Sequence, residues 1–262
     1  MYLTISLIIS SIMTLVFWHN PLITSNGTNQ VEPGFALTFD DDTISEWYEI
    51  RPLLKNNNIK ATFFISSKGN FSKTEIAMLQ ELIKDGHEIG VHGWSHENSI
   101  ERLKYQNAAD YVNDELIKLK EYLQHVEIET SSFAYVNGIR NKKLDKLVAE
   151  HFTHIRAVSE SQRHVPVKNI QTVDDIYFEG RGEQTINSLC IDSLQKLSIE
   201  DFNFIFDRIA HNNEIVTFYA HKPVYKNTDL TWDVQIQFLQ EIFDLANHFG
   251  LRSYLFREIP HA

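Results

Sequence analysis

Residues 60–92 read KATFFISSKGNFSKTEIAMLQELIKDGHEIGVH, and this stretch decides the fold. It opens on one short β-prone run, KATFFIS, and closes on another, HEIGVH. Between them lies KTEIAMLQELIKDG, an amphipathic stretch whose Gly86 is suited to end a helix. A strand, a helix and a second strand in this order predict two parallel strands joined by a crossover helix.

The same alternation runs from residue 35 to the end of the chain. The other β-prone runs are FALTF (35–39), SSFAYV (131–136), THIRAVS (153–159), TINSLCI (185–191), EIVTFYA (214–220) and LRSYLF (251–256). Amphipathic stretches follow them at 46–58, 107–124, 141–152, 199–213 and 233–250. Seven or so such repeats are enough to close, or nearly close, a barrel. Because no linker or low-complexity segment interrupts them, we predict one α/β domain over residues 35–262.

Composition narrows the classes of function. The chain has 262 residues, of which 43% are hydrophobic, so it can bury a sizeable core. Its formal net charge of -11 argues against a nucleic-acid or anionic-membrane surface, which would need a basic patch. Cys190 is the single cysteine, which excludes an intramolecular disulfide and a multi-thiolate metal site. Any metal would therefore be held by His, Asp and Glu side chains.

The N-terminal segment differs in character from the rest of the chain. MYLTISLIISSIMTLVFW (1–18) is apolar and uncharged, and polar residues 19–34 follow it. A run of this length is typical of a signal peptide or a short membrane anchor, and a buried N-terminal helix is the alternative. We expect an exported protein, secreted, periplasmic or membrane-anchored, with residues 19–34 as a tether or N-terminal tail.

The candidate site follows from where the predicted strands end. In parallel β/α folds, the loops at the carboxyl ends of the strands line the ligand site. The residues just past these ends are Asp40 to Asp42, Ser66 and Ser67, His92 to His96, Asn137 and Gly138, and His221. Carboxylates and histidines are thus expected on one rim of the barrel.

His92 and His96 are four residues apart, so a single helical turn would bring both rings to one side at chelating distance. Two ordinary surface histidines would show the same spacing. Beside an acidic strand end, however, two imidazoles and one carboxylate form a standard ligand set that leaves open positions for water and substrate.

The acidic run allows a division of roles. One carboxylate can bind the metal while its neighbour acts as a base, so Asp40 and Asp41 can take different roles. Asp42 is better explained as a solvated turn or helix N-cap residue. His221 is either a structural histidine or, through its place on the same rim, a general acid. A base, an activated water and an acid together describe hydrolysis of an acyl group.

Four motifs resemble those of the polysaccharide deacetylases, carbohydrate esterase family four. They are LTFDDD (37–42), HEIGVHGWSHEN (87–98), SSFAYVNG (131–138) and VTFYAHKP (216–223). The resemblance extends over most of the chain from about residue 34 to 258 and implies a distorted (β/α)7-type barrel. It also implies a divalent metal, usually zinc, and removal of N- or O-acetyl groups from a glycan such as chitin, peptidoglycan or acetylated xylan.

The resemblance assigns roles to the rim. Asp40 looks like the catalytic base, and Asp41 looks like a metal ligand together with His92 and His96. His221 looks like the acid that protonates the leaving amine or alcohol.

This chain also departs from the family pattern. Asp42 replaces a Gly of the first motif. In the third motif, Ala134 stands where many members have an Arg that orients the base, and Asn137 stands where they have a Tyr. The backbone N–H of Asn137 could still serve the oxyanion, and Arg156 on the next predicted strand could replace the missing Arg. The fourth motif, an Asp near a Trp, has no counterpart that we identify.

The altered third motif leaves a second reading open, a catalytically impaired relative that binds glycan in the same cleft. A third reading is a metal-dependent phosphoesterase on a similar barrel, although the predicted rim offers few cationic phosphate clamps. Aromatic residues near the rim could stack on sugar rings or belong to the core, namely Trp94, Tyr135, Tyr219 and Trp232.

Overall fold

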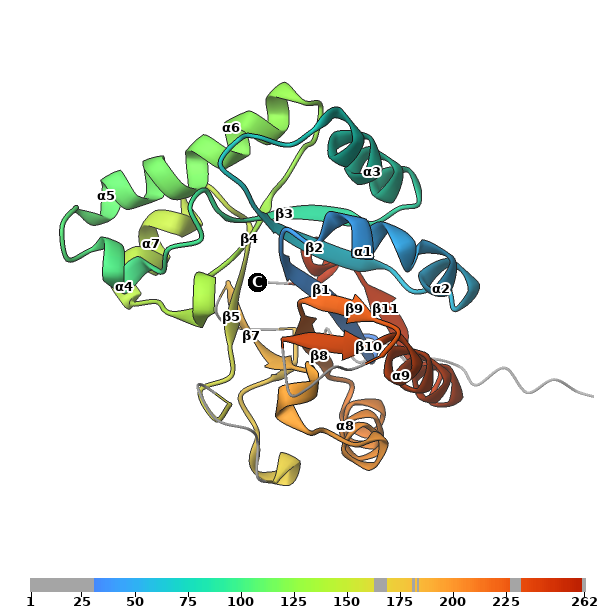
Figure 1. The fold of residues 1–262 in the computed structure, drawn as a ribbon. Helices are drawn as coiled ribbons and strands as arrows, with labels where there is room; N and C mark the ends of the chain where they lie inside the picture. Colours follow the sequence, from blue (N-terminus) through green and yellow to red (C-terminus); the bar gives the residue numbers. More distant parts are fainter. Residues whose placement is uncertain (1–30, 163–168, 181, 183, 227–231, 261–262) are drawn as a thin grey trace, which may run out of the picture.

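The computed structural model describes residues 31–162, 169–180, 182, 184–226 and 232–260. A closed barrel of 7 parallel strands forms its centre, because β1 is hydrogen-bonded to β2 on one side and to β8 on the other (Figure 1). In order around the barrel the strands are β1 (Gly34–Asp41), β2 (Ala61–Ser66), β3 (Glu88–Gly93), β4 (Ser132–Ala134), β5 (His154–Val158), β7 (Thr185–Cys190) and β8 (Ile215–Ala220). The predicted (β/α)7-type barrel in a single domain is confirmed.

Helices surround the barrel and connect its strands (Figure 1). They are α1 (Ile44–Glu49), α2 (Arg51–Asn56), α3 (Lys73–Lys84), α4 (Ser99–Arg102), α5 (Ala108–Tyr111), α6 (Lys118–His125), α7 (Lys142–Ala149), α8 (Ile199–Asn212) and α9 (Ile236–His248). The helix predicted over 107–124 is present, but a π-helical turn, η1 (Val112–Ile117), joins α5 to α6. Short 3₁₀ turns are η2 (Val136–Gly138), η3 (Ile170–Thr172), η4 (Ser193–Gln195) and η5 (Phe256–Glu258).

Several features distort the barrel. Strands β3 and β4 share a single register pair, Val91 with Phe133. The C-terminal run forms β11 (Arg252–Tyr254), which pairs with the start of β1 outside the ring of seven. Strand β6 (Tyr177–Phe178) pairs antiparallel with the start of β8, and β9 (Lys222–Val224) pairs with β10 (Asp233–Gln235) in a separate sheet.

The two-residue alternation of β1 separates its apolar face from its polar one. Phe35 and Phe39 contact the outer layer: the Phe35 ring lies 5.8 Å from Phe206 of α8, and Phe39 stacks at 5.4 Å on Phe63. The intervening positions face the barrel interior, where the Thr38 hydroxyl donates to the carbonyl of Phe218 at 2.9 Å. Asp40 continues this inward series and is only 3% exposed.

The C-terminal turn η5 closes the barrel at the end where its strands begin. The Phe256 ring packs edge-on against Phe64 at 5.5 Å, and its backbone N–H donates to the Thr62 hydroxyl. The buried Glu88 carboxylate accepts from the hydroxyls of Thr62 and Ser132 in the same layer. Side chains thus fill this end of the barrel interior, opposite the carboxyl ends of the strands.

The domain begins earlier than residue 35. Val31 is buried, the backbone carbonyl of Glu32 accepts from the Tyr254 hydroxyl at 2.9 Å, and Gly34 already belongs to β1. Residues 31–34 are therefore part of the packed domain rather than of a tether. The predictions for residues 1–18 and 19–30 concern segments outside the described residues. Within the described part of the chain, no helix combines the length and hydropathy needed to cross a membrane.

Candidate active site

The last two residues of β1 point in different directions. Asp40 follows the inward series of the strand, whereas Asp41 has a φ of 85°, in the left-handed region that non-glycine residues rarely adopt. This change of backbone conformation turns the Asp41 carboxylate toward the rim, where its side chain is 32% exposed. The two adjacent carboxylates are thereby separated, as the sequence analysis expected.

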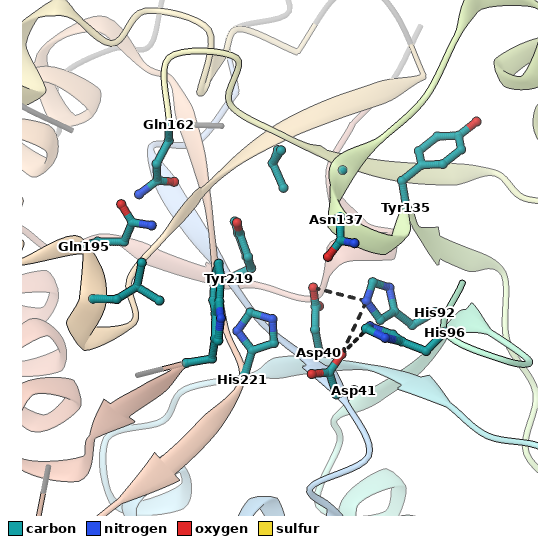
Figure 2. A pocket seen from close by; sticks show the side chains of 14 residues that line it. Asp40, Asp41, His92, His96, Tyr135, Asn137, Gln162, Gln195, Tyr219 and His221 are labelled. Carbon is teal, nitrogen blue, oxygen red and sulfur yellow. Dashed lines mark ion pairs between the residues drawn. The ribbon is translucent and has the colours of Figure 1, made fainter. Parts of the chain in front are cut away.

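Asp41, His92 and His96 bring one ligand atom each into a single group, with all three atoms within 4.8 Å of one another. The Asp41 Oδ1 atom lies 2.9 Å from Nε2 of His96 and 3.7 Å from Nε2 of His92 (Figure 2). This oxygen is buried and forms no hydrogen bond to any residue that the structure describes, although it is close to both rings. Its lone pairs and the two Nε2 atoms thus face a common point, as the ligands of a divalent cation would.

Hydrogen bonding fixes the tautomer of His92. Its Nδ1 atom lies 2.9 Å from the carbonyl oxygen of Ala134, so Nδ1 carries the proton and donates it to that acceptor. The Nε2 lone pair is then free to face the metal position. Burial lowers the pKa of His92, against the opposing effect of Asp40 and Asp41, and this keeps the ring neutral as metal binding requires.

The other two ligands form a charged pair in the absence of a cation. Burial alone would raise the pKa of Asp41, but close contact with His96 and the charges of His92 and His221 hold it well below its usual range. Contact with Asp41 raises the pKa of His96, and burial only partly offsets this. In the absence of a cation, a proton on His96 therefore compensates the negative charge of Asp41, as a bound metal ion would.

A helical turn was predicted to bring the two histidines together. The structure instead brings them together through a turn of another kind. His92 lies in β3, and the chain then reverses through Gly93 with a φ of 112° and His96 with a φ of 58°. This left-handed turn places the two ring centroids 5.2 Å apart. Glycine adopts a positive φ without steric cost, so Gly93 allows the chain to reverse directly after His92. A helical turn would not require a glycine at this position.

Asp40 is paired with a buried arginine from the opposite side of the barrel. Arg156 of β5 is 1% exposed, and its Nη2 donates a hydrogen bond to Oδ2 of Asp40. Its Nη1 donates to the Ser188 hydroxyl at 3.0 Å, and the guanidinium lies 4.6 Å from the Tyr219 ring centroid. The other Asp40 oxygen, Oδ1, is buried and has no hydrogen-bond partner within the described part of the chain. One oxygen of the carboxylate is thus fixed and the other is left free to accept a proton.

His221 follows β8 and is held by a carboxylate that the sequence analysis did not single out. Asp192, fully buried after β7, accepts from Nδ1 of His221 at 2.5 Å and from its backbone N–H at 3.1 Å. Burial alone would lower the pKa of His221, but this hydrogen bond and the charges of Asp192, Asp40 and Asp41 raise it to about 9. The Trp232 ring packs edge-on against His221 at 5.1 Å. His221 is therefore protonated at neutral pH and oriented through Nδ1.

A cavity of about 500 Å³ joins these groups. Figure 2 shows Asp40, Asp41, His92 and His96 on one side, with His221 facing them and Gln162 and Gln195 further along the wall. Gln195 is 4% exposed, and its Oε1 has no hydrogen-bond partner among the described residues. The cavity can thus accept a ligand with both polar and apolar faces.

The residues predicted to contact substrate differ in how they lie relative to the cavity. Asn137 lines the cavity, in a turn with a φ of 53° that packs closely on β5: a Cβ on the next residue, Gly138, would lie 2.2 Å from Val158. Tyr135 also lines it, but its hydroxyl points away and donates to Asp145 at 2.9 Å, so that hydroxyl is not available to a substrate (Figure 2).

Trp94 is not among the residues that line the cavity. Its ring packs edge-on against Tyr122 at 6.2 Å and lies under the ammonium of Lys118 at 4.1 Å. The turn after Gly93 directs this side chain toward the helices rather than toward the metal position.

The described fold is similar to a solved family 4 carbohydrate esterase from Streptomyces lividans in complex with acetate. The TM-score is 0.56 at 12% identity, over 88% of this chain and 96% of that one. In sequence, the polysaccharide deacetylase family matches residues 28–154, which include β1, β3 and three of the four motifs. Just under half of this chain is therefore similar to the polysaccharide deacetylase family.

Individual relatives match this chain over short stretches. A chitin deacetylase from Pestalotiopsis sp is 40% identical over 63 residues, which are 24% of this chain and 21% of that protein. A peptidoglycan-N-acetylglucosamine deacetylase from Bacillus cereus is 36% identical over 92 residues, 35% of this chain and 31% of that protein. The chain thus aligns with less than a third of the length of either relative.

At two places where the motifs of this chain depart from the pattern they resemble, residues from elsewhere in the chain lie near the site. Ala134 and Arg156 are register partners on the adjacent strands β4 and β5, so Arg156 delivers a guanidinium at the level where the third motif lacks one. Asp192 and Trp232 both contact His221, so the missing acidic and aromatic pair is assembled from two separate loops. The position of Asp192 just past TINSLCI was the available signal, because it lies on the same rim as the other strand ends.

Substituting Asp41 tests the metal site directly, and Asp42 offers a matched control. Asp42 is exposed, and it precedes Thr43, the N-cap of α1, so it is a turn residue rather than the cap. We expect Asp41→Asn to weaken the binding of a divalent cation such as Zn²⁺ at least about 100-fold because one of the three candidate ligands loses its charge, while Asp42→Asn leaves it unchanged. Competition with a chromophoric chelator measures both; equal affinities of the two variants would contradict this assignment.

Proposed function

We propose that this chain is a zinc-dependent hydrolase that removes acetyl groups from a carbohydrate polymer or oligosaccharide. The observation that carries the proposal is the convergence of the ligand atoms of Asp41, His92 and His96 beside two differently supported groups, Asp40 and His221, around one cavity. The names of the relatives, a chitin deacetylase and a peptidoglycan-N-acetylglucosamine deacetylase, support an acetylated glycan as substrate.

A divalent ion bound by these three ligands would lower the pKa of a water molecule and polarise the acetyl carbonyl. Asp40, with Oδ1 free and Oδ2 held by Arg156, accepts the proton of the attacking water. His221, protonated and held through Nδ1, presents Nε2 to the leaving amine or alcohol and donates its proton to it. The backbone N–H of Asn137, at the cavity wall, is placed to stabilise the oxyanion.

Other functions have less support. The reading as an impaired glycan-binding relative depended on the loss of the Arg at position 134, and Arg156 supplies a guanidinium to Asp40 instead. A phosphoesterase would need cationic groups around the phosphate, and none of the described residues that line the cavity is Lys or Arg. The apolar run 1–18 is consistent with export toward an extracellular glycan, and that location is part of the proposal.

Acetate release tests the proposal. The full chain, loaded with one equivalent of zinc, is incubated with chitin oligosaccharides, peptidoglycan and acetylated xylan, with and without chelator. We expect acetate from at least one substrate, abolished by the chelator. Asp40→Asn should lower kcat at least about 100-fold because the base is lost, while zinc stays bound. Asp42→Asn is the control; an Asp40→Asn variant as active as the wild type would overturn the mechanism.

The role of Arg156 is tested by Arg156→Lys, which keeps the buried positive charge but loses the planar fork that reaches both Asp40 and Ser188. We expect kcat to fall about 10- to 100-fold through misplacement of the base, with KM little changed. Ser188→Ala removes only the second contact and should cost much less. Equal kinetic effects of the two variants would show that the arginine does not act through Asp40.

The pH dependence tests His221 as the acid. Its protonated form is the active one, so kcat/KM should fall as the pH rises through the pKa of His221, at or below about 9 because a bound cation opposes the raised value. Asp192→Asn removes the main group that raises this pKa and should shift the alkaline limb to lower pH. Asp207→Asn, on the exposed face of α8, is the control; an unmoved limb in Asp192→Asn would exclude this coupling.

A further inference from the structure

Glu115 is a buried carboxylate that the proposed mechanism does not use. It lies in the π-helical turn η1 and is 1% exposed, although the flanking residue Asp114 faces solvent. Burial of a carboxylate is unfavourable unless hydrogen bonds or opposite charges compensate it. Its partners therefore indicate what this side chain is for.

Those partners belong to the turn that carries the metal ligand His96. Oε2 of Glu115 accepts from the backbone N–H of Ser95 at 2.8 Å, and Oε1 accepts from the Ser95 hydroxyl at 2.7 Å. The backbone carbonyl of Glu115 also accepts from the N–H of Trp94 at 2.8 Å. One residue of the helix thus binds two consecutive backbone N–H groups of the turn.

The far side of His96 is anchored through the same carboxylate. Nη2 of Arg102 lies 3.3 Å from Oε1 of Glu115, and its Nη1 donates to Glu97 at 3.3 Å. The Tyr105 hydroxyl also donates to Glu97 at 2.6 Å. His96 therefore lies between two residues, Ser95 and Glu97, that are both tied to this network.

The turn needs such support because its backbone is unfavourable. Gly93 and His96 both have positive φ, and left-handed conformations of non-glycine residues persist only where the surroundings impose them. A π-turn is a rare insertion in a helix and is often found at functional sites. Here it lies at the point where the Glu115 side chain and carbonyl both reach the turn.

We propose that Glu115 is a positioning residue for the metal ligand His96, which it holds in place through Ser95. With the turn fixed in advance, metal binding does not have to order it, so the affinity for the ion is higher. The inference rests on the proposed function only in using the same three ligands, because it concerns metal affinity rather than the reaction.

Glu115→Gln tests this inference, with Asp114→Asn as the matched control from the same turn. A glutamine can accept from only one of the two Ser95 donors, and its own N–H₂ group faces the other donor or Arg102. We expect the zinc affinity of the full chain, measured by competition with a chromophoric chelator, to fall about 10- to 100-fold in Glu115→Gln. Asp114→Asn should retain the wild-type affinity.

A second measurement separates positioning from a general loss of stability. In the metal-free protein, hydrogen exchange of the peptide containing residues 93–97 should be faster in Glu115→Gln, while exchange of the β1 peptide should be unchanged. Ser95→Ala removes one hydroxyl contact and should give a smaller loss of zinc affinity in the same direction, even if Glu115→Gln fails to fold.

Two outcomes distinguish this inference from the proposed function. A wild-type chain that binds no zinc would overturn the proposed metal site itself. A wild-type chain that binds zinc, with Glu115→Gln and Ser95→Ala equal to it in zinc affinity, would overturn the positioning role alone.

Discussion

A carboxylate buried inside a barrel needs hydrogen bonds or a positive charge beside it, and Arg156 supplies both to Asp40. The two residues come from β1 and β5, strands that are not neighbours in the sheet, so their contact crosses the interior of the barrel. Phe64 and Tyr219 pack around the guanidinium, and Ser188 takes another of its donors. The interior side chains near the carboxyl ends of the strands are thus arranged around Arg156. This arginine determines where Asp40, the candidate base, can lie.

The remaining polar groups of the site are supported in the same way, each by a partner on another element. His92 donates to the carbonyl of Ala134 on β4, and His221 donates to Asp192 after β7. The backbone carbonyl of His221 also accepts from the Trp47 indole N–H of α1 at 3.0 Å. Because these supports fix one atom of each side chain, the opposite atom of each ring faces the cavity. The geometry of the site is therefore a consequence of how the strands are arranged around the barrel.

Much of this arrangement could be predicted because parallel strands end on one rim. The alternation of strand and helix placed Asp40, Asp41, His92, His96 and His221 together without any contact being known. The direction of each side chain was harder to predict from the sequence, since it depends on backbone dihedral angles at the strand ends. Trp94 shows this, because the positive φ of Gly93 precedes it and its ring packs against Tyr122 instead of lining the cavity.

Long-range partners were the least predictable part. Asp192 lies just past a predicted strand, but its hydrogen bonds to His221 and its burial depend on the folded structure and are not visible in the sequence. The π-turn at Glu115 also has no clear signature in the sequence. One extra residue in a helix leaves most of the spacing between apolar residues unchanged. Such features follow from contacts between segments that are distant in sequence, and one chain alone does not reveal them.

In this chain the arginine beside Asp40 comes from β5, whereas the third motif that the chain resembles would place an arginine on the neighbouring strand β4. Ala134 and Arg156 are register partners, so a guanidinium from either strand would enter the same layer of the interior. Two arginines there would repel each other and would not fit beside Phe64 and Tyr219, both of which already contact Arg156. The small side chain of Ala134 is therefore the necessary complement of Arg156 rather than a simple loss. The chemistry depends on a positive charge at one oxygen of Asp40, and the barrel allows that charge to come from more than one strand.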